Sequence, residues 1–403
     1  MKKRVAVLGA TGSIGKSALD VITRGKDDFE VVLLSAHNNA EELARLGRLW
    51  PGAITVLSGG SGGGERLLAA IAGCGADITL NGISGAAGLE PSMAAIEAGS
   101  DLALANKETL VMAGPLVFQK AREKKARIIP VDSEHSAVFH LIEAHGSDAL
   151  DEIILTASGG PFRDYSVEEM KKVTPQAALA HPTWNMGPKI TIDSASMANK
   201  GLEVIEAARL FNFEPEKIKV VIHPQSIVHS MVRMKDGAVY AQLSRPDMRL
   251  PIHKALYWSE TRNYPERIFN HGVHGVSRRR RGFRTKTPCN SVSSVVNSSD
   301  FGRLDFDSLS LTFYQPDTEK FPLLALAYEA VKKGGLYPCA YNGANEAAAG
   351  AFLAGRVGFL DISRITRYVL DKDWSAEPGD IASVIQADRQ ARIMAEKEIE
   401  ELA

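Results

Sequence analysis

A glycine-rich turn near the start of the chain constrains the fold more than any other feature of the sequence. The turn, Gly9–Gly15 (GATGSIG), follows a β-branched run at Arg4–Leu8 and opens a helical pattern at Lys16–Arg24. A second buried-strand pattern follows at Phe29–Ser35. A strand, a glycine turn, a helix and a strand within about 35 residues form a βαβ unit, which belongs to a parallel sheet.

The same turn indicates nucleotide binding, with a bare tight turn as the alternative. Glycines let the backbone approach a pyrophosphate, and a helix N-terminus offers free N–H groups to it. The second strand is followed by Ala36, His37 and Asn38, and not by the acidic residue that favours NAD. Since no carboxylate stands there to repel a 2′-phosphate, we expect NADP(H).

Further patterns predict an α/β domain that ends near Pro130, then a mixed α+β domain, then helices. In the first domain we expect strands at Ile78–Leu80, Asp101–Ala105 and Ala126–Val131 and a helix at Pro91–Ala98. In the second we expect strands at Glu152–Ala157 and Ile190–Asp193, helices at Ser136–Ala144 and Lys200–Leu210, and antiparallel strands at Val220–His223, Val228–Met234 and Ala238–Gln242, with a hairpin turn at Asp236-Gly237. From Pro322 to Ala403 the pattern is helical throughout.

Two carboxylates in the run Pro130–His135 indicate a metal site. If this run is a strand end, Asp132 and Glu134 point the same way, with Cα atoms about 7 Å apart. Like charges held together need a cation, and oxygen ligands suit Mg²⁺ or Mn²⁺. Glu203 offers a third carboxylate. Solvated surface acids are the alternative.

Polar runs at other predicted strand ends indicate a bound phosphorylated or hydroxylated substrate. Lys107 lies between Asn106 and Glu108 just after a strand, where open α/β sheets bind ligands; a charged helix start is the alternative. Ser158 lies in a Ser-Gly turn after a predicted strand, and Ser194 lies in a polar run, Asp193–Ser196, that ends another. Both suit a phosphate.

The stretch His181–Lys189 contains two prolines, a Trp and a Met without periodicity. This composition favours a loop that closes over a substrate, and an aromatic plug in the core is an equal alternative. For His223 and His229 we favour a structural or subunit-interface role over ligation.

Eight strings, in order along most of the chain, resemble the 1-deoxy-D-xylulose 5-phosphate reductoisomerase family. They are GATGSIG, NGISGAAGL, LANKETLV, PVDSEHSA, LTASGGPFR, HPTWNMGPKITIDSASMANKGLEVIEA, IHPQSIVHSMV and NGANEAAAGAFL. The resemblance implies an oxidoreductase that uses NADPH and Mg²⁺ or Mn²⁺, with Co²⁺ as a further option. It would rearrange and reduce a small phosphorylated sugar, 1-deoxy-D-xylulose 5-phosphate, to 2-C-methyl-D-erythritol 4-phosphate in the non-mevalonate isoprenoid pathway. A homodimer is also implied.

The resemblance also implies an architecture. We expect a Rossmann-like NADPH-binding domain at 1–130, an α+β catalytic domain with the metal site, the substrate site and the dimer interface at 131–266, an atypical basic insert and linker at 267–321, and a C-terminal helical domain at 322–403.

Carried over motif by motif, the resemblance assigns site residues. The metal ligands fall on Asp132, Glu134 and Glu203, and the catalytic residues on Lys107, Glu134, His181 and Glu203. Substrate contacts fall on Lys107, Ser133, Glu134, Ser158, His181, Ser194, Asn199, Lys200 and Glu203, with Ser158, Ser194, Asn199 and Lys200 around the phosphate. Cofactor contacts fall on Thr11, Gly12, Ser13, Ile14, Ala36, His37, Asn38, Asn106, Glu108 and Gly187. Trp184 and Met186 would lie in the loop that closes.

The chain departs from the family pattern in two places. Between Trp50 and Ile78 it is short, Gly59–Gly64 (GGSGGG) stands in place of part of a βα unit, and an outer strand of the cofactor domain is expected to be missing. A nonenzymatic or impaired relative with a damaged cofactor domain is therefore one alternative. Another NADP-linked dehydrogenase is the rival enzyme.

The second departure is a basic segment, Arg267–Ser299. It has no acidic residue and seven basic ones. Since the whole chain has a net charge of −1, the rest of the chain has a net charge of −8. We expect a disordered surface loop or the product of a reading-frame error. Because the arginine run at 278–284 has just Phe283 as an aromatic partner and matches no recognisable nucleic-acid-binding module, we expect no nucleic-acid partner.

The sequence also indicates where the protein resides. No apolar run approaches the roughly 20 residues that span a bilayer, so we expect no membrane partner. The three cysteines, Cys74, Cys289 and Cys339, lie far apart and form no disulfide framework, so we expect a reducing, cytoplasmic location.

Overall fold

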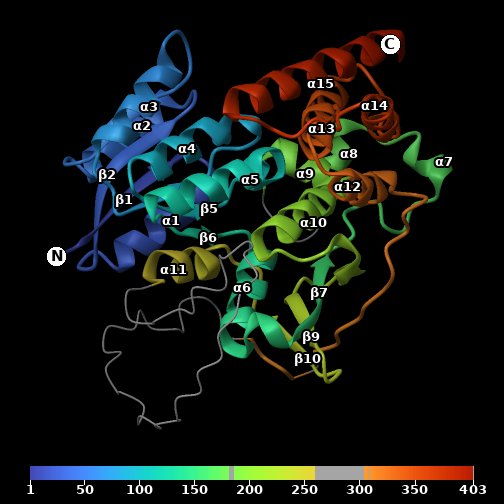
Figure 1. Cartoon of the computed structure of the whole chain (residues 1–403), viewed down its shortest axis with the longest axis horizontal. Coiled ribbons are helices and arrows are strands. Elements are labelled where there is room, and N and C mark those ends of the chain that lie inside the picture. Colours follow the sequence, from blue (N-terminus) through green and yellow to red (C-terminus); the bar gives the residue numbers. More distant parts are fainter. Residues whose placement is uncertain (181–185, 259–303, 308, 403) are drawn as a thin grey trace.

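Two sheets and a group of C-terminal helices build the molecule (Figure 1). The computed structural model describes residues 1–180, 186–258, 304–307 and 309–402. Within these residues the first sheet has six parallel strands in the order β3-β2-β1-β4-β5-β6. They are β1 (Lys3–Leu8), β2 (Phe29–Ala36), β3 (Ile54–Leu57), β4 (Ile78–Asn81), β5 (Asp101–Leu104) and β6 (Ile128–Pro130).

The strand order reverses between β1 and β4, which is where open α/β sheets form a ligand crevice at the carboxyl ends of their strands. The connecting helices are α1 (Ser13–Arg24), α2 (Ala40–Leu49), α3 (Gly63–Gly73), α4 (Leu89–Glu97) and α5 (Lys107–Lys124). The expected Rossmann-like architecture is confirmed.

The short segment between Trp50 and Ile78 forms a strand and a helix. This segment supplies one edge strand, β3, which pairs with β2. The expectation that a further outer strand of the family pattern is missing stays a prediction. Gly60 and Gly62 have φ angles of +83° and +66°. This left-handed backbone, which glycine adopts without steric strain, lets the chain turn from β3 directly into α3.

The second sheet has the order β10-β9-β7-β8. Its strands are β7 (Leu150–Ala157), β8 (Ile218–Ile222), β9 (Val228–Met234) and β10 (Val239–Leu243). β9 and β10 form the expected hairpin, in which Gly237 has a φ of +90°. The antiparallel expectation for Val220–His223 is wrong, because β8 runs parallel to β7. Helices between these two strands provide the long crossover that a parallel pair requires.

A helix replaces the strand expected at Ile190–Asp193, so that expectation is wrong. This helix, α9, spans Pro188–Ala195. The β-branched residues suggested a strand, but Pro188 stands at the first helical turn, where its fixed φ is favourable. Lys189 and Asp193 also pair at the i,i+4 spacing of a helix.

The remaining helices are α6 (Ser133–His145), α7 (Val167–Met170), α8 (Pro175–Ala178), α10 (Ala198–Phe211), α11 (Arg249–Tyr257), α12 (Pro322–Lys333), α13 (Tyr337–Leu353), α14 (Asp361–Leu370) and α15 (Ile381–Leu402). Among them α6 packs on the second sheet, and α11 packs on α1 and on β5 and β6 of the first sheet. The others include the helices of the C-terminal part, where the helical expectation is confirmed. None of the described helices is both long and apolar enough to cross a membrane.

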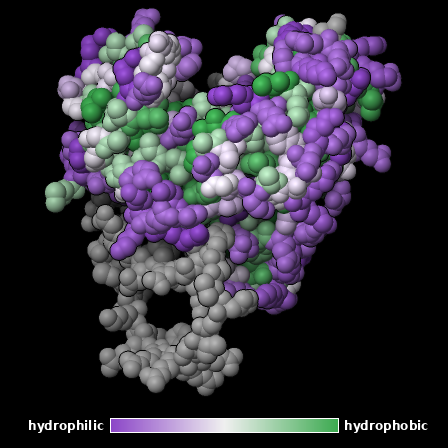
Figure 2. All heavy atoms as spheres, turned by 45° about the horizontal axis from the view of Figure 1, so that its top comes forward, coloured by the Kyte–Doolittle hydropathy of each residue, from purple (hydrophilic) through white to green (hydrophobic). Residues whose placement is uncertain are grey.

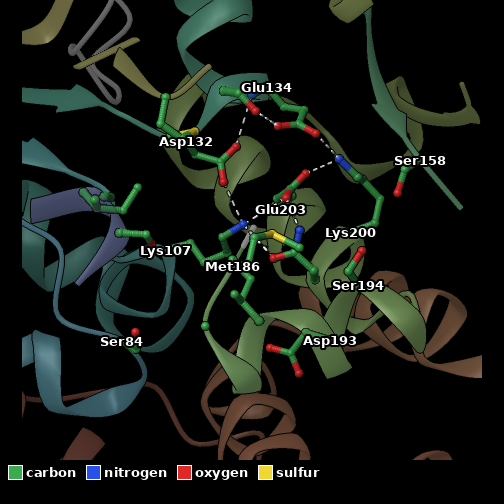
Figure 3. A pocket seen from close by; sticks show the side chains of 18 of the residues that line it. Ser84, Lys107, Asp132, Glu134, Ser158, Met186, Asp193, Ser194, Lys200 and Glu203 are labelled. Carbon is green, nitrogen blue, oxygen red and sulfur yellow. Dashed lines mark hydrogen bonds and ion pairs between the residues drawn. The ribbon is translucent and has the colours of Figure 1, made fainter. Parts of the chain in front are cut away.

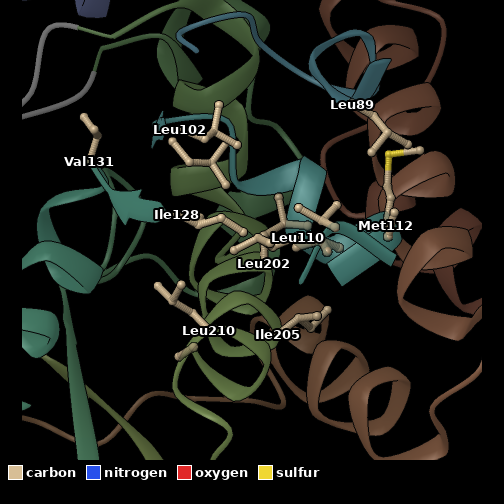
Figure 4. Close-up of a cluster of buried hydrophobic side chains, with 14 of the residues drawn as sticks. Leu89, Leu102, Leu110, Met112, Ile128, Val131, Leu202, Ile205 and Leu210 are labelled. Carbon is tan, nitrogen blue, oxygen red and sulfur yellow. The ribbon is translucent and has the colours of Figure 1, made fainter. Parts of the chain in front are cut away.

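Helix α10 joins the three parts through one continuous core. Leu202 and Leu210 of α10 lie with Leu110 of α5 and with strand residues Leu102 and Ile128 (Figure 4). On the other side of α10, a Cβ added at Gly201 would lie 2.7 Å from the Tyr341 hydroxyl of α13 and from Ala327 of α12. The helix that carries Glu203 is therefore fixed on both sides.

Hydrophilic side chains cover most of the face drawn in Figure 2. The same face is hollowed at its upper edge, between the side with the six-stranded sheet and the side with the C-terminal helices.

Candidate active site

A cavity of about 750 Å³ contains most of the residues that the sequence singles out. It lies where the carboxyl ends of the parallel strands meet α6, α9 and α10 (Figure 3). Its lining includes the expected residues Gly12, Ser13, Ile14, Lys107, Glu108, Asp132, Ser133, Glu134, Ser158, Met186, Gly187, Ser194, Asn199, Lys200 and Glu203.

Three carboxylates meet in this cavity. Asp132, Glu134 and Glu203 each offer an oxygen within 4.8 Å of the others. The expected strand end at Asp132 and Glu134 is wrong: β6 stops at Pro130, and Asp132 is the N-cap of α6, accepting a hydrogen bond from the Glu134 N–H at 3.2 Å. The two acids converge because both stand at a helix N-terminus, whose N–H groups favour negative charge.

Two lysines neutralise these acids. Lys107 Nζ lies 2.7 Å from Asp132 Oδ2 and 2.9 Å from Glu203 Oε1. Lys200 Nζ lies 2.8 Å from Glu134 Oε1 and also pairs with Glu203 (Figure 3). Glu203 thus bridges both ammonium groups, which come from helices of different domains of the fold.

Burial and neighbouring charges set the protonation of this cluster. Burial, with the repulsion of Glu203 and Asp132, raises the pKa of Glu134 to about 7. Burial also opposes the charge of Asp132, but Lys107 and His135 hold the pKa of Asp132 well below its usual range. For Lys107, the surrounding carboxylates outweigh burial and raise the pKa well above its usual value.

A second group of three, which the sequence analysis missed, lies behind the first. His135 Nδ1 lies 3.1 Å from Asp132 Oδ1 and 3.3 Å from Glu206 Oε2, and His135 Nε2 lies 2.9 Å from the Glu203 carbonyl oxygen. Burial works against a charged imidazole, but Glu206 and Asp132 raise the pKa of His135 to about 9. Helical spacing was the available signal: His135 follows Asp132 by three residues, and Glu206 follows Glu203 by three.

The expected phosphate contacts line one wall of the cavity. Ser158 follows β7, and Ser194 lies in the last turn of α9. A Cβ added at Gly160 would lie 2.9 Å from the Ser194 carbonyl oxygen, so the glycine there lets the Ser158 turn pack against α9. Lys200 lines the same cavity with its ammonium directed at Glu134 and Glu203.

The glycine turn forms the opposite end of the cavity. Gly9 has a φ of +75°, and a Cβ added at Gly15 would lie 2.4 Å from the Gly9 carbonyl oxygen, so α1 packs directly on the turn. Gly12 caps α1, and the first turn of α1 contains no acidic residue. The free N–H groups of the helix therefore face the cavity without a competing carboxylate.

Four expected cofactor residues, Thr11, Ala36, His37 and Asn38, are not among the described residues that line the cavity. Thr11 belongs to the glycine turn itself, and Ala36, His37 and Asn38 follow β2. A Cβ added at Gly59 would lie 2.5 Å from the His37 carbonyl oxygen and from Asn38 Oδ1. The first glycine of the GGSGGG run thus packs on the residues expected to contact the cofactor.

Asn106 and Glu108 fix a loop at the cofactor end. Asn106 is buried and donates to the carbonyl oxygens of Ile83 and Gly85 at 2.8 and 2.9 Å. It also donates to Glu108 Oε2 at 2.9 Å. Ile83 and the neighbouring Ser84 line the cavity, and the sequence analysis did not select them as site residues.

Lys189 and His229 are further lining residues. Lys189 Nζ lies 3.2 Å from Glu108 Oε1, and the sequence analysis placed it only at the end of a loop. His229 Nε2 lies 3.2 Å from the Ser244 carbonyl oxygen, and burial lowers the pKa of His229 to about 4. A neutral His229 bonded to the Ser244 carbonyl oxygen agrees with the structural role that we favoured. Because His229 lines the cavity, its side chain is also within reach of a ligand.

Three expectations lie outside the described residues. They concern His181, Trp184 and the basic segment Arg267–Ser299.

The donor set of the cavity suits a hard divalent cation. Three carboxylates with converging oxygens match the oxygen ligands of Mg²⁺ and Mn²⁺, whereas sites for softer metals use sulfur or several imidazoles. The cavity therefore combines an acidic site for a cation, hydroxyl and ammonium groups suited to a phosphate, and a glycine turn suited to a dinucleotide.

Family models match three parts of the chain. The model described as 1-deoxy-D-xylulose 5-phosphate reductoisomerase matches residues 5–62 and 60–114. Its C-terminal domain model matches 128–211, and the model described as DXP reductoisomerase C-terminal domain matches 243–394. The first match is split at residues 60–62, inside the GGSGGG run.

Curated relatives and solved structures agree with these matches. The chain is 44% identical over 401 residues to the 1-deoxy-D-xylulose 5-phosphate reductoisomerase of Treponema denticola, covering 98% of this chain and 96% of that protein. The solved enzyme of Zymomonas mobilis in complex with NADPH has a TM-score of 0.83 at 40% identity over the whole of both chains. A DOX-P reductoisomerase in complex with NADPH, fosmidomycin and magnesium has a TM-score of 0.81 at 35% identity, covering 99% of this chain and 98% of that chain.

Proposed function

The chain belongs to the 1-deoxy-D-xylulose 5-phosphate reductoisomerase family, and from this premise we propose how its residues carry out the family's reaction. The reaction is the NADPH- and divalent-metal-dependent conversion of 1-deoxy-D-xylulose 5-phosphate to 2-C-methyl-D-erythritol 4-phosphate in isoprenoid biosynthesis. One observation carries the proposal: the acidic cluster and the glycine turn line the same cavity.

Residues 1–130 hold NADPH in this proposal, with the glycine turn on the pyrophosphate. The support is the position of Gly12, Ser13 and Ile14 at the N-terminus of α1 and at the reversal of strand order. Bound NADPH supplies the hydride for the reduction.

Asp132, Glu134 and Glu203 hold the divalent cation in this proposal. Bound there, the cation supplies Lewis acidity toward the hydroxyl and carbonyl oxygens of the substrate. Lys107, held between Asp132 and Glu203, keeps its proton and presents a positive charge beside those oxygens.

Ser158, Ser194, Asn199 and Lys200 bind the substrate phosphate in this proposal. Their positions along one wall support it. A phosphate held far from the bonds that change orients the reacting carbons, so that binding energy lowers the barrier. Met186 lines the cavity just before α9, and in this proposal it helps to cover the bound substrate and to exclude water.

We further propose a cytoplasmic homodimer whose interface includes β10. This strand is an edge of the second sheet in the described structure and exposes apolar side chains, with Val239 at 45% and Tyr240 at 42% of their surface. Exposed apolar edges are unfavourable in a free monomer. The buried thiols of Cys74 and Cys339 fit a reducing location.

The direct test follows NADPH absorbance with 1-deoxy-D-xylulose 5-phosphate, with and without Mg²⁺ or Mn²⁺. We expect NADPH oxidation that depends on both the sugar and the metal. NADPH oxidation with other substrates but not with this sugar would favour a different dehydrogenase. Failure to bind NADPH in a fluorescence titration would favour an impaired relative.

A further inference from the structure

The string NGANEAAAGAFL contributes no residue to the expected site, although its helix, α13, reaches the cavity with Leu353. The polar residues of this string are shielded from solvent. Asn342 and Asn345 are 0% exposed, and the Glu346 side chain is 13% exposed. Buried polar groups are normally retained for the hydrogen bonds they make. Two of these residues bond to segments that line the cavity, Glu346 to the Ile83–Ala86 loop and Asn345 to α9.

Glu346 anchors the loop at the cofactor end. Its Oε1 accepts the backbone N–H of Ala86 at 3.0 Å and the Asn342 amide at 3.1 Å. A Cβ added at Gly85 would lie 3.0 Å from the same oxygen, so the loop backbone rests directly on the carboxylate. Ser84, the neighbour of Gly85, lines the cavity (Figure 3).

Asn345 anchors α9 at the phosphate wall. Its Nδ2 donates to Asp193 Oδ1 at 2.9 Å, and both side chains are buried. Asn345 Oδ1 is buried and has no hydrogen-bond partner among the described residues. An unpaired buried acceptor is unfavourable, so the amide is placed for its bond to Asp193, the neighbour of Ser194.

Further contacts close these two anchors into a ring. Asp193 Oδ2 lies 2.6 Å from Lys189 Nζ, which lies 3.2 Å from Glu108 Oε1. Glu108 Oε2 accepts from Asn106, and the same amide of Asn106 donates to the carbonyl oxygen of Gly85. The ring runs through the cofactor loop, α5, α9 and α13, and so connects all three parts of the fold.

We infer that Glu346 and Asn345 are positioning residues of the C-terminal domain, which hold the Ile83–Ala86 loop for the cofactor and the Asp193–Ser194 turn for the substrate phosphate. This inference rests on the proposed function. Neither residue touches the reacting atoms. Glu346 acts through its hydrogen bond to Ala86, two residues after the lining residue Ser84. Asn345 acts through its hydrogen bond to Asp193, which lines the cavity next to Ser194.

The first test separates anchoring of the loop from general stability. In Glu346→Gln the amide oxygen still accepts the Ala86 N–H, whereas the pairing with Arg392, 2.6 Å in the protein, is lost. In Glu346→Ala both are lost. We expect the NADPH dissociation constant, measured by fluorescence titration, to rise about tenfold in Glu346→Ala and to stay within about twofold in Glu346→Gln.

A control removes a more exposed ion pair of the same length, which also involves α15. Arg356 and Glu396 also pair at 2.6 Å, and Glu396→Gln is expected to leave NADPH affinity unchanged. Equal NADPH affinity in the protein and in Glu346→Ala would overturn the inference for Glu346. So would an equal loss of NADPH affinity in Glu346→Gln and Glu346→Ala, because that pattern follows from the lost Arg392 pair alone.

The second test concerns the other wall. Asn345→Ala is expected to raise KM for the phosphorylated sugar about fivefold and to change the NADPH dissociation constant by less than about twofold. Its bond reaches Asp193 directly, whereas it reaches the cofactor loop only through Lys189, Glu108 and Asn106. An unchanged KM, or an equal effect on both ligands, would overturn the inference for Asn345. Failure of the unmodified protein to bind NADPH or turn over the sugar would instead defeat the proposed function itself.

Discussion

Asp132 belongs to two groups of three side chains that lie back to back and differ in their access to the cavity. The cavity group is completed by Glu134 and Glu203, and the buried group by His135 and Glu206. Glu134 has 18% and Asp132 has 12% of its side chain exposed, whereas His135 and Glu206 have 0% and 1%. Both groups bring three potential ligand atoms within 4.8 Å of one another.

The difference shows why ligand atoms at metal distance do not by themselves define a metal site. The buried group already contains its own cation, since the pKa of His135 is raised to about 9 by Glu206 and Asp132 against the effect of burial. The cavity group opens to a ligand. The negative charge of its carboxylates is balanced by Lys107 and Lys200, and lysine has a flexible side chain. We therefore treat the cavity group as the cation site and the buried group as its support.

The largest effect is expected from Asp132→Asn, because this residue belongs to both groups. Loss of its charge removes a proposed cation ligand and leaves Lys107 and His135 each with one carboxylate fewer. We expect turnover to fall at least about a hundredfold, or about 2.7 kcal/mol of barrier, together with a lower melting temperature. Steady-state kinetics and a thermal melt measure both, and turnover within tenfold of the unmodified enzyme would contradict the central position given to Asp132.

Glu203→Gln should affect the cavity group more than the buried one. The Glu203 side chain bridges Lys107 and Lys200 in the cavity, while the His135 contact uses the Glu203 backbone carbonyl, which the substitution keeps. We expect at least about a tenfold loss of turnover, roughly 1.4 kcal/mol, and weaker Mg²⁺ or Mn²⁺ binding. Glu216→Gln, which removes an exposed partner of Lys332, serves as the control. Normal turnover and metal dependence in Glu203→Gln would defeat the assignment of this ligand.

A pH effect on stability is expected from the buried group. The folded-state pKa of His135, about 9, lies above its usual 6.5. Its contribution, about 3 kcal/mol, is thus fully present below pH 6.5 and is lost as the pH rises through 9. The melting temperature of the unmodified protein should exceed that of His135→Gln at pH 6, and the difference should shrink by pH 9.5. A difference that grows with pH would contradict a charged His135.

Local sequence patterns identified the members of the cavity group but not their geometry. Asp132 and Glu134 stand out as acids after a strand, yet the i,i+2 strand argument was wrong, because a helix N-cap at Asp132 brings them together. The strand predicted at Ile190–Asp193 was wrong for a similar reason, because this stretch belongs to α9. At Asp132 the acidic pair was given more weight than the N-cap signal that starts a helix. At Ile190–Asp193 the β-branched residues were given more weight than Pro188, which marks a first helical turn.

Contacts between distant segments were beyond local patterns. Lys107 and Asp132 come from different helices, and Asn345 reaches Asp193 across 152 residues. Periodicity places such residues on elements but does not state which elements meet. The resemblance of the long motifs supplied the family and the fold. The ring of contacts through α13, and the contacts of His135 and Glu206 behind the cavity group, could be found only in the three-dimensional structure.

The most direct test of the account is a Mn²⁺ titration followed by electron paramagnetic resonance on a matched pair of variants, Glu134→Gln and Glu206→Gln. Each removes one carboxylate whose pKa burial raises to about 7, one from the cavity group and one from the buried group. We predict one Mn²⁺ per chain in the unmodified protein, at least about tenfold weaker binding in Glu134→Gln, and binding within about threefold in Glu206→Gln. Unchanged Mn²⁺ affinity in Glu134→Gln with loss of binding in Glu206→Gln would contradict the account.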